Sequence, residues 1–391
     1  MILLLSLQIF GDIGEGFQPI RIFVILCAPF ILYFCEKDVV IRYRYRYERY
    51  FFLFWFIYGT ASLFIAFDLP KSIKEILYLL INFFSYFTLV YFSYKASSPK
   101  LSIIKGWLIL FLLLCPFSLY ELWTNNHLGL FDLNDASFNR SNRRYTAVTF
   151  SNINRLNTVL AYMIPFFFGF LLISKRRRLF LWIICFIFSY IILSNGSRAS
   201  TVCLFLGWAL FIPFYFMKSV NKNAIRAFLF IFTLLIVGFF ISNTFDDTFT
   251  TITKRFSEKG LQDTTRTNII NIALDELLNS KLLGIGAGNF APLMENKHQL
   301  RITAPHNLFI EIATQYGIIV FILFAGLFIR LFLKQEANSI NSDKFIVILS
   351  LITLPFLSII DSSYLLRTNI WLFLASLTII SDKEYNNTTI T

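Results

Sequence analysis

The sequence is short of charge and of the residues that usually build soluble chemical sites. Charged residues make up 15% of its 391 residues, whereas about 25% is usual in a soluble domain, and histidine occurs only three times. No CxxC pair is present, and the cysteines lie in or at the edge of apolar runs. We therefore expect small packed thiols, not disulfides or metal ligands, at Cys27, Cys35, Cys115, Cys185 and Cys203.

What the sequence has in abundance is apolar and aromatic surface. Hydrophobic residues make up 57% of the chain and aromatic residues 18%, with 48 phenylalanines and a mean hydropathy of +0.65. Runs close to the ~20 residues that cross a ~30 Å hydrocarbon core recur along the whole chain. The ten-residue alternation of a membrane β-barrel is absent. The composition predicts an all-α polytopic membrane protein.

The apolar runs predict about twelve transmembrane helices. The N-terminal "MILLLSLQIF" is interpreted as the end of a first helix, because it lacks the basic segment and the cleavage site of a removed leader. The expected helices cover about residues 1–10, 20–36, 50–67, 72–94, 103–119, 156–173, 179–194, 199–217, 225–243, 307–333, 345–361 and 364–380.

Basic residues are concentrated in alternate linkers. The positive-inside rule places these linkers and both termini in the cytoplasm, which explains the net charge of +12 without a nucleic-acid partner. Within them, "RYRYRYER" (42–49) is interpreted as an anchor of arginine and interfacial tyrosine. More than half of the 35 lysines and arginines lie in 37–49, 95–105, 174–178, 217–226, 330–344 and the tail from 381.

Two long linkers then face outward. Residues 1–243 are expected to hold nine helices with an outer loop at 120–155, residues 244–305 a large outer loop, and residues 306–391 three helices and a short cytoplasmic tail. The large loop contains "TTRTNIINIALDELLNSKLLG", which predicts an amphipathic helix lying along the outer face, with Gly284 as its stop. Its apolar stripe is expected at Ile270, Leu274, Leu277 and Leu278.

Ionisable residues gather at the predicted outer helix ends rather than in the middle of the spans. Proton-coupled transporters usually carry such groups at membrane depth, so the pattern favours a site at the outer interface. The residues concerned are Arg198, Arg266, His306, Glu311, Asp361 and Arg367.

The stretches around these residues resemble a known family. "TAVTFSNINRLNTVLAY" (146–162), "NGSRAS", "TTRTNIINIAL…LLGIGAGNF" and "PHNLFIEIATQYGIIVFILF" follow one another within about residues 140–330. In this order they resemble the bacterial O-antigen ligase and O-antigen polymerase superfamily, with a fold similar to glycosyltransferase-C enzymes.

Matched residue by residue, the resemblance implies three catalytic groups. Arg198 matches the arginine after a small-residue turn, Arg266 the arginine that opens the periplasmic helix, and His306 the histidine of the His-Asn or His-Ser motif. Gly317 matches the closing glycine. Gln315 departs from the pattern, since many members have glutamate there. The substrate-binding candidates are Arg198, Arg266, Arg144, Asn154, Asn289, Asn307 and Glu311.

The resemblance also implies the reaction and its setting. Members transfer a glycan from undecaprenyl pyrophosphate to an acceptor sugar at the periplasmic face of the inner membrane, with inversion and without metal or other cofactor. Guanidinium groups match phosphate oxygens bidentately and remain charged, so Arg198 and Arg266 fit the leaving pyrophosphate. An imidazole, with a reference pKa near 6.5, fits His306 as the group that accepts the acceptor's proton.

The expected function is a surface polysaccharide polymerase, which joins glycan from undecaprenyl pyrophosphate to a lipid-linked repeat unit. The alternative within the family is a ligase, whose acceptor is lipid A–core; less favoured are a flippase of lipid-linked sugars and a receptor-like scaffold. The expected partners are the lipid-linked donor and acceptor, membrane lipids and a chain-length regulator, with no nucleic acid.

Structural roles, without catalysis or substrate binding, would also explain several of these residues. Arg198 and Arg266 could be interfacial anchors or solvated residues, and His306 a helix cap. "GIGAGNF" (284–290) lacks the lysine and the preceding strand of a phosphate loop, so a tight turn is favoured. Arg140, Arg143 and Arg144 could bind phosphate or be merely solvated, and the acidic pair Asp12 and Glu15 is interpreted as a polar turn rather than a metal site.

Overall fold

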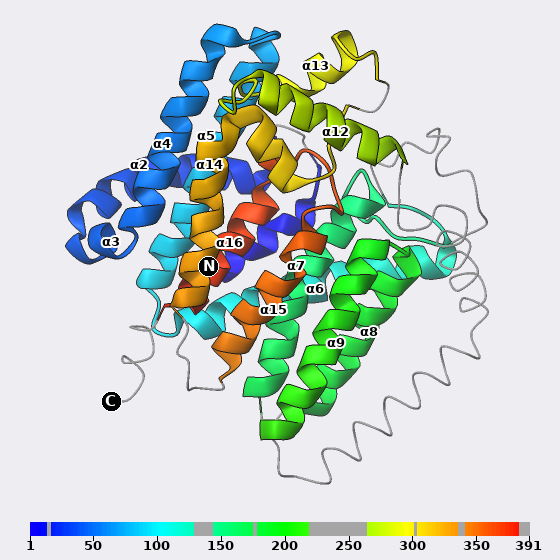
Figure 1. Cartoon of the computed structure of the whole chain (residues 1–391). Helices are drawn as coiled ribbons and strands as arrows, with labels where there is room; N and C mark the ends of the chain where they lie inside the picture. Colours follow the sequence, from blue (N-terminus) through cyan, green and yellow to red (C-terminus); the bar gives the residue numbers. More distant parts are fainter. Residues whose placement is uncertain are drawn as a thin grey trace.

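A computed structural model describes residues 1–13, 17–128, 144–174, 178–218, 264–300, 303–334 and 341–382, and these are helical with no strand among them (Figure 1). The longer helices are α2 (Pro19–Lys37), α4 (Arg46–Ala61), α5 (Leu69–Tyr94), α6 (Pro99–Thr124), α7 (Ile153–Ile173), α8 (Arg178–Asn195), α9 (Arg198–Lys218), α12 (Thr264–Asn279), α14 (Leu308–Leu333), α15 (Ser342–Leu357) and α16 (Thr368–Ile380). The shorter ones are α1 (Ile2–Ser6), α3 (Val39–Arg44), α13 (Phe290–Asn296) and the 3-10 turns η1 (Leu7–Phe10), η3 (Ser62–Ile65) and η4 (Tyr364–Leu366).

The prediction of an all-helical chain is confirmed for the described residues. Within the described ranges, five helices are long and apolar enough to cross a membrane by length and composition, namely α5, α6, α7, α9 and α14. Shorter apolar helices lie at 19–34, 179–195 and 368–380. The predicted helix at 225–243 lies outside the described residues.

One predicted linker is wrong, because most of residues 37–49 are helical. α3 and the first turn of α4 replace the expected loop. Ile41 on α3, Tyr45 between the two helices and Glu48 on α4 are buried, each at most 1% exposed. The alternation of arginine and tyrosine gave no sign of which residues are buried, because tyrosine occurs both at the surface and in the core.

Helices α7 and α16 form the centre of the bundle. α16 packs against α5, and α7 packs against α15, α9, α6 and α8. Almost every residue of α16 is buried, and Trp371 on it meets Trp55, Phe52 and Phe83 with ring centroids 5.3 to 5.8 Å apart. Lipid tails are as apolar as leucine, so close packing rather than the hydrophobic effect holds such helices together. Interlocking rings are one way to achieve it.

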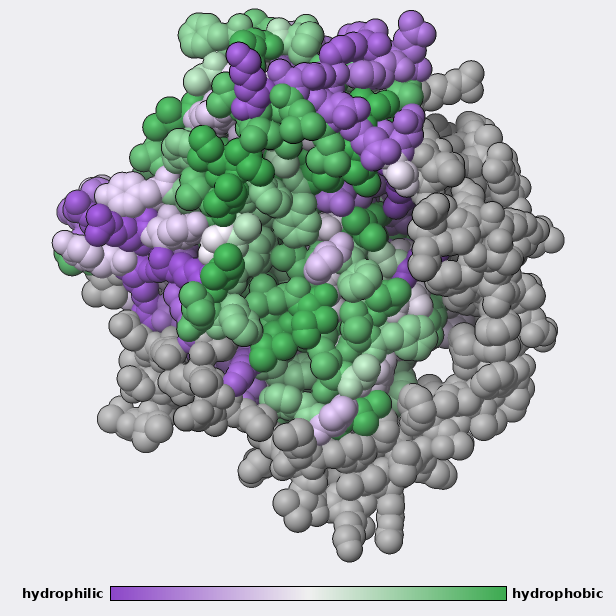
Figure 2. All heavy atoms as spheres, in the orientation of Figure 1, coloured by the Kyte–Doolittle hydropathy of each residue, from purple (hydrophilic) through white to green (hydrophobic). Residues whose placement is uncertain are grey.

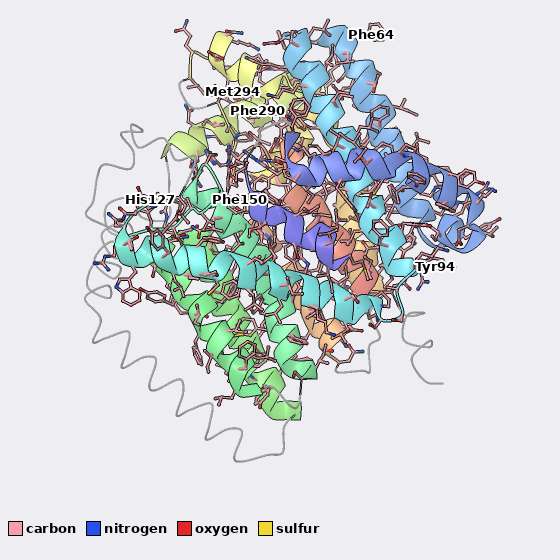
Figure 3. The ribbon with its side chains drawn as sticks, turned by 180° about the vertical axis from the view of Figure 1, so that it is seen from behind. Phe64, Tyr94, His127, Phe150, Phe290 and Met294 are labelled. Atoms are coloured by element: carbon pink, nitrogen blue, oxygen red, sulfur yellow. The ribbon has the colours of Figure 1, made fainter. Side chains whose placement is uncertain are left out.

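The linkers gather at two opposite ends of the bundle. At one end, Lys95 pairs with Asp38 (3.6 Å), Lys100 with Asp343 (2.8 Å) and Arg44 with Asp382. At the other end lie α12, α13 and the turn before α5; Figure 3 shows Phe64, Phe290 and Met294 there and Tyr94 far from them. We call the end that carries α12 the site end.

α14 is broken at Gly317, where φ is +77° and ψ is 174°. The break frees carbonyl groups of the preceding turn, and the N–H groups of Ile285 and Gly286 donate to Thr314 O (2.8 Å) and Gln315 O (2.9 Å). A helix kink of this kind requires replacement partners for its carbonyls. The loop after α12 supplies them, so the expected tight turn at 284–290 is a brace for α14.

Replacing Gly317 with alanine is expected to destabilise the protein by about 3 kcal/mol or more. A Cβ atom there would lie 2.5 Å from the backbone oxygen of Leu283, in a backbone conformation that side chains rarely adopt. Gly326→Ala on the same helix is the control, because its Cβ would meet only the hydroxyl at the end of the Tyr47 side chain. Equal melting temperatures for the two purified variants would contradict this explanation.

The amphipathic helix of the large loop is confirmed as α12, but its predicted stripe is wrong in part. Ile269 and Ala273 are buried against α13 and α14, and Leu277 is buried as predicted, whereas Leu274 and Leu278 are 41% and 64% exposed. The helix has apolar residues on two neighbouring faces, and alanine was overlooked as a packing residue. The helix also ends at Asn279, five residues before the expected stop at Gly284.

α12 lies across the site end of the bundle, with α13 beside it (Figure 1). In the same orientation, Figure 2 shows hydrophilic side chains gathered over these two helices and apolar side chains over the helices below them. This contrast distinguishes the site end from the apolar flank of the bundle, and the candidate site lies beneath α12.

Candidate functional site

The loop between α15 and α16 (358–367) joins two of the three predicted catalytic segments. Arg266, in the first turn of α12, donates from Nη1 to the carbonyl oxygen of Ile359 at 3.3 Å. The N–H of Leu308, two residues after His306, donates to the carbonyl oxygen of Ser358 at 3.0 Å. Arg266 and the His306 turn are therefore held by adjacent residues of one loop.

His306 has a strained backbone. Its φ is +47°, which is uncommon for a residue other than glycine, and such conformations cluster at functional sites. The next residue, Asn307, caps α14, with Oδ1 accepting from the N–H groups of Phe309 (3.0 Å) and Ile310 (3.2 Å). The cap fixes the turn, and the half-buried imidazole precedes it.

Arg198 opens α9 at the same end of the bundle. Asn195, in the turn before it, accepts the N–H of Thr146 (2.8 Å) and donates to Asn157 (2.9 Å). α9 packs against α15, and the thiol of Cys203 on α9 lies 3.8 Å from the carbonyl oxygen of Thr353 on α15. Arg198 lies five residues before Cys203 and Ser358 five residues after Thr353, a rise of about 7.5 Å on each helix. The start of α9 thus lies level with the α15–α16 loop.

Glu311 also holds this loop. Its side chain is buried in the first turn of α14, and Oε2 accepts the N–H of Tyr364 at 3.0 Å. The hydroxyl of Tyr364 in turn donates to Leu357 O at 2.7 Å. This carboxylate therefore has a structural role on the loop, and its predicted contact with substrate stays a prediction.

Sequence reasoning missed a set of charges beside the loop. Asp12 accepts from Arg155 Nη1 through Oδ2 and from Arg367 Nη1 through Oδ1, both at 2.6 Å. The N–H and hydroxyl of Ser151 also donate to Asp12 at 2.9 Å. Arg367 was singled out, but no pattern pairs residues so distant in sequence. Asp12 is therefore a brace that ties the N-terminal segment to α7 and to the start of α16.

The surroundings of Asp12 keep it charged. Burial would raise the pKa of Asp12, but the charges of Arg367 and Arg155 and the hydrogen bonds from Arg155 and Ser151 lower it to about 2. Burial raises the pKa of the neighbouring Asp361, although the same two arginines oppose that effect. A cavity of about 20 Å³ lies among these groups, which is room for one water molecule and not for a sugar.

Replacing Asp12 with asparagine is expected to lower stability by about 2 kcal/mol at neutral pH. Because the folded-state pKa lies below the unfolded value, wild-type protein keeps this contribution above about pH 4 and loses it as the pH falls towards 2. The melting temperature of purified Asp12→Asn should depend less on pH in that window. Asp68→Asn, at an aspartate more accessible to solvent, is the control; an identical pH dependence in wild type and Asp12→Asn would contradict this assignment.

The remaining substrate-binding candidates differ in their surroundings. Asn289 is fully buried and used in packing: Oδ1 accepts from Phe67 N (2.9 Å) and Nδ2 donates to Ile285 O (2.6 Å). Asn289 therefore has a structural role in this packing, and its predicted contact with substrate stays a prediction. Arg144 is exposed, and Asn154 is half-buried in the first turn of α7. Arg140 and Arg143 lie outside the described residues, as does Glu15.

The "GIGAGNF" loop cannot cradle a phosphate with its main chain. Besides the bonds of Ile285 and Gly286 to α14, the N–H of Ala287 donates to Ser62 Oγ (2.9 Å) and that of Gly288 to Gln315 Oε1 (2.7 Å). The departure from the family pattern at Gln315 thus has a structural use, since its amide oxygen holds this loop.

Chemically, the site end offers two arginines at helix starts and an imidazole at a strained turn. Helix N-termini present free N–H groups and a positive dipole end, which favour anions. Arg198 lies at the first residue of α9 and Arg266 at the third of α12. Such an arrangement suits a transfer reaction in which an anionic group leaves and the attacking hydroxyl loses a proton.

The fold is that of a helical protein with helices long and apolar enough to cross a membrane, and comparisons with known proteins show which family it resembles. Residues 183–325 match the O-antigen ligase family, a range that contains Arg198, Arg266 and His306. The chain is also 26% identical over 344 residues to teichuronic acid biosynthesis protein TuaE of Bacillus subtilis (strain 168), covering 83% of this chain and 69% of that protein. Both matches confirm the resemblance to the O-antigen ligase and polymerase superfamily.

Proposed function

We propose that this protein is a polysaccharide polymerase of the bacterial inner membrane. It transfers a growing glycan from undecaprenyl pyrophosphate to a lipid-linked repeat unit, with the site end facing the periplasm and both termini in the cytoplasm. The observation that carries the proposal is the attachment of Arg266 and the His306 turn to neighbouring residues, Ile359 and Ser358, of one loop.

The chemistry follows from the charges of these side chains. The acceptor hydroxyl attacks the anomeric carbon from the face opposite the pyrophosphate, the bond from carbon to pyrophosphate oxygen breaks, and the configuration inverts. The hydroxyl proton passes to His306, and undecaprenyl pyrophosphate leaves with the bonding electron pair. Arg198 and Arg266 stabilise the negative charge that develops on the pyrophosphate, as a divalent cation does in other enzymes.

A ligase that moves finished polymer onto lipid A–core is the second candidate, since donor chemistry is shared and only the acceptor differs. The family match is described as O-antigen ligase, which favours this alternative. The abundance of phenylalanine favours the polymerase by association with other polymerases. The two differ in which acceptor the site admits.

Deletion of the gene distinguishes these functions by what accumulates. Loss of a polymerase is expected to leave single repeat units on the surface lipid, whereas loss of a ligase leaves polymer on undecaprenyl pyrophosphate. Loss of a flippase strands repeat units in the inner leaflet. Electrophoresis of extracted surface glycan and lipid-linked intermediates gives the answer, and stranded polymer in the deletion strain would replace the polymerase assignment with the ligase.

A further inference from the structure

We propose that a groove between α4 and α14, at the end of the bundle opposite the candidate site, binds one anionic phospholipid of the surrounding membrane. The groove has a volume of about 570 Å³, within the range of small-molecule sites. It is lined by Tyr43, Arg46, Tyr47, Tyr50, Phe51, Phe54, Leu323 and Arg330.

The arginine–tyrosine run builds one wall of the groove. Residues 46, 47, 50 and 54 recur at the spacing of one face of α4, and Tyr43 lies near the end of α3 before it. The hydroxyl of Tyr47 donates to Leu323 O on α14 at 2.6 Å, and a Cβ atom at Gly326 would lie 2.5 Å from that hydroxyl. The hydrogen bond from Tyr47 joins α4 to α14 along the groove.

Arg46 is the cation best placed for a headgroup. Of the four arginines in the run, Arg42 and Arg49 pair with Glu36, and Arg44 pairs with Asp382. Arg46 is exposed and lies 5.6 Å from the centre of the Tyr50 ring. Among the described residues, no carboxylate forms an ion pair with it. An anionic group is therefore the partner that its charge fits.

Arg330 adds a second cation from α14. It lies 5.4 Å from the centre of the Tyr47 ring and 3.6 Å from Glu48, and it donates to Arg44 O at 3.3 Å. Its guanidinium is held in place at the rim beside Arg46. Glu48 partly offsets the charge of Arg330, so Arg46 is the main partner for a phosphate headgroup, because guanidinium donors bind phosphate oxygens bidentately.

The rest of the groove is apolar and opens to the lipid-facing flank. Phe51, Phe54 and Leu323 line it away from the arginines, and the neighbouring side chains that point outwards are Leu53, Ile57, Ile322 and Ile329, each at least 55% exposed. From Arg46 to Phe54, within α4, the wall is about 12 Å long, which lies within the ~15 Å depth of one leaflet of a ~30 Å hydrocarbon core. A lipid of one leaflet fits this length, with its phosphate at Arg46 and a chain along the phenylalanines.

The distribution of hydrophilic side chains at the surface agrees with a lipid whose phosphate lies at Arg46. Figure 2 shows hydrophilic side chains over α3 and the start of α4, beside the apolar flank of the bundle. The groove lies far from the α15–α16 loop, since Arg330 is near the end of α14 and His306 precedes its start. Occupation of the groove is therefore separable from binding of a glycan donor.

The test uses the purified full chain in a neutral detergent, with native mass spectrometry to count bound lipid. Phosphatidylglycerol and phosphatidylcholine with the same acyl chains are the probes. We expect wild-type protein to retain one phosphatidylglycerol in preference, and Arg46→Gln to bind it about fivefold more weakly. Arg42→Gln removes the same charge from the same run outside the groove and should bind as wild type does.

Three outcomes would overturn the proposal: no preference for phosphatidylglycerol in wild type, equal weakening by Arg42→Gln and Arg46→Gln, or displacement of the lipid by millimolar inorganic phosphate. Leu323→Trp fills the groove without changing charge, and we expect it to exclude both lipids. Retained lipid in that variant would also contradict the site. Helical content by circular dichroism establishes that each variant is folded before its lipid is counted.

Discussion

Replacing His306 with alanine is expected to reduce glycan transfer at least ~100-fold while the protein still inserts into the membrane, since proton transfer by a positioned side chain contributes ~10²–10⁴-fold to such reactions. The imidazole lies at a turn with a φ of +47° that is held by the Asn307 cap, and alanine removes the ring without altering that cap. The measurement is polymer formation from a lipid-linked donor by purified protein in detergent.

His298→Ala provides a matched control for this result. His298 lies in the same part of the chain but contacts Glu276 at 2.9 Å, and Lys297 reaches the same carboxylate at 2.6 Å. Burial would raise the pKa of Glu276, but these two partners outweigh that effect and lower it. Loss of His298 should therefore affect local stability only. A wild-type rate of glycan transfer in His306→Ala would contradict the role of His306 as the proton acceptor.

Replacing Arg266 with alanine is expected to reduce transfer by about 100-fold or more, because one charge facing the pyrophosphate is lost. Loss of its long hydrogen bond to Ile359 O, at 3.3 Å, is expected to cost only about 1 kcal/mol of stability. Arg266→Lys keeps the charge but not the bidentate geometry, so we expect intermediate activity. The assay should show unreacted lipid-linked donor accumulating.

Lys71→Ala is the control for Arg266, because it removes an exposed cation from the start of α5, at the same end of the bundle. Its transfer rate should match wild type. A similar loss of activity in Lys71→Ala and Arg266→Ala would indicate a general effect of surface charge. Full activity in Arg266→Ala would exclude this arginine from the pyrophosphate site.

The helices were predictable because apolar length is a strong signal in a membrane protein. Some segments of the candidate site were also singled out from the sequence: Arg266, His306 and Asp361 lie in or beside segments that meet at the α15–α16 loop. The predicted helix at 345–361 was too long, since α15 ends at Leu357. The residues after it form the loop that connects the site, and their apolar character resembled helix.

Other parts depended on contacts between distant residues. Nothing local to Asp12 indicates Arg155 and Arg367 as partners, and "GDIGEG" by itself resembles a polar turn. Gly317 carried a family match, but its kink is stabilised by Ile285 and Gly286, which belong to the loop after α12. The prediction of the buried stripe on α12 was wrong in part because two adjacent faces of the helix are apolar. Only packing against α13 and α14 determines which of them is buried.

The most direct test is an experimental structure of the protein with undecaprenyl pyrophosphate bound. We expect both phosphates to lie between Arg198 and Arg266, within hydrogen-bond distance of each guanidinium, with the His306 imidazole facing the position of the departing sugar. Phosphates bound at the opposite end of the bundle, or on a surface remote from these three side chains, would contradict the proposed site.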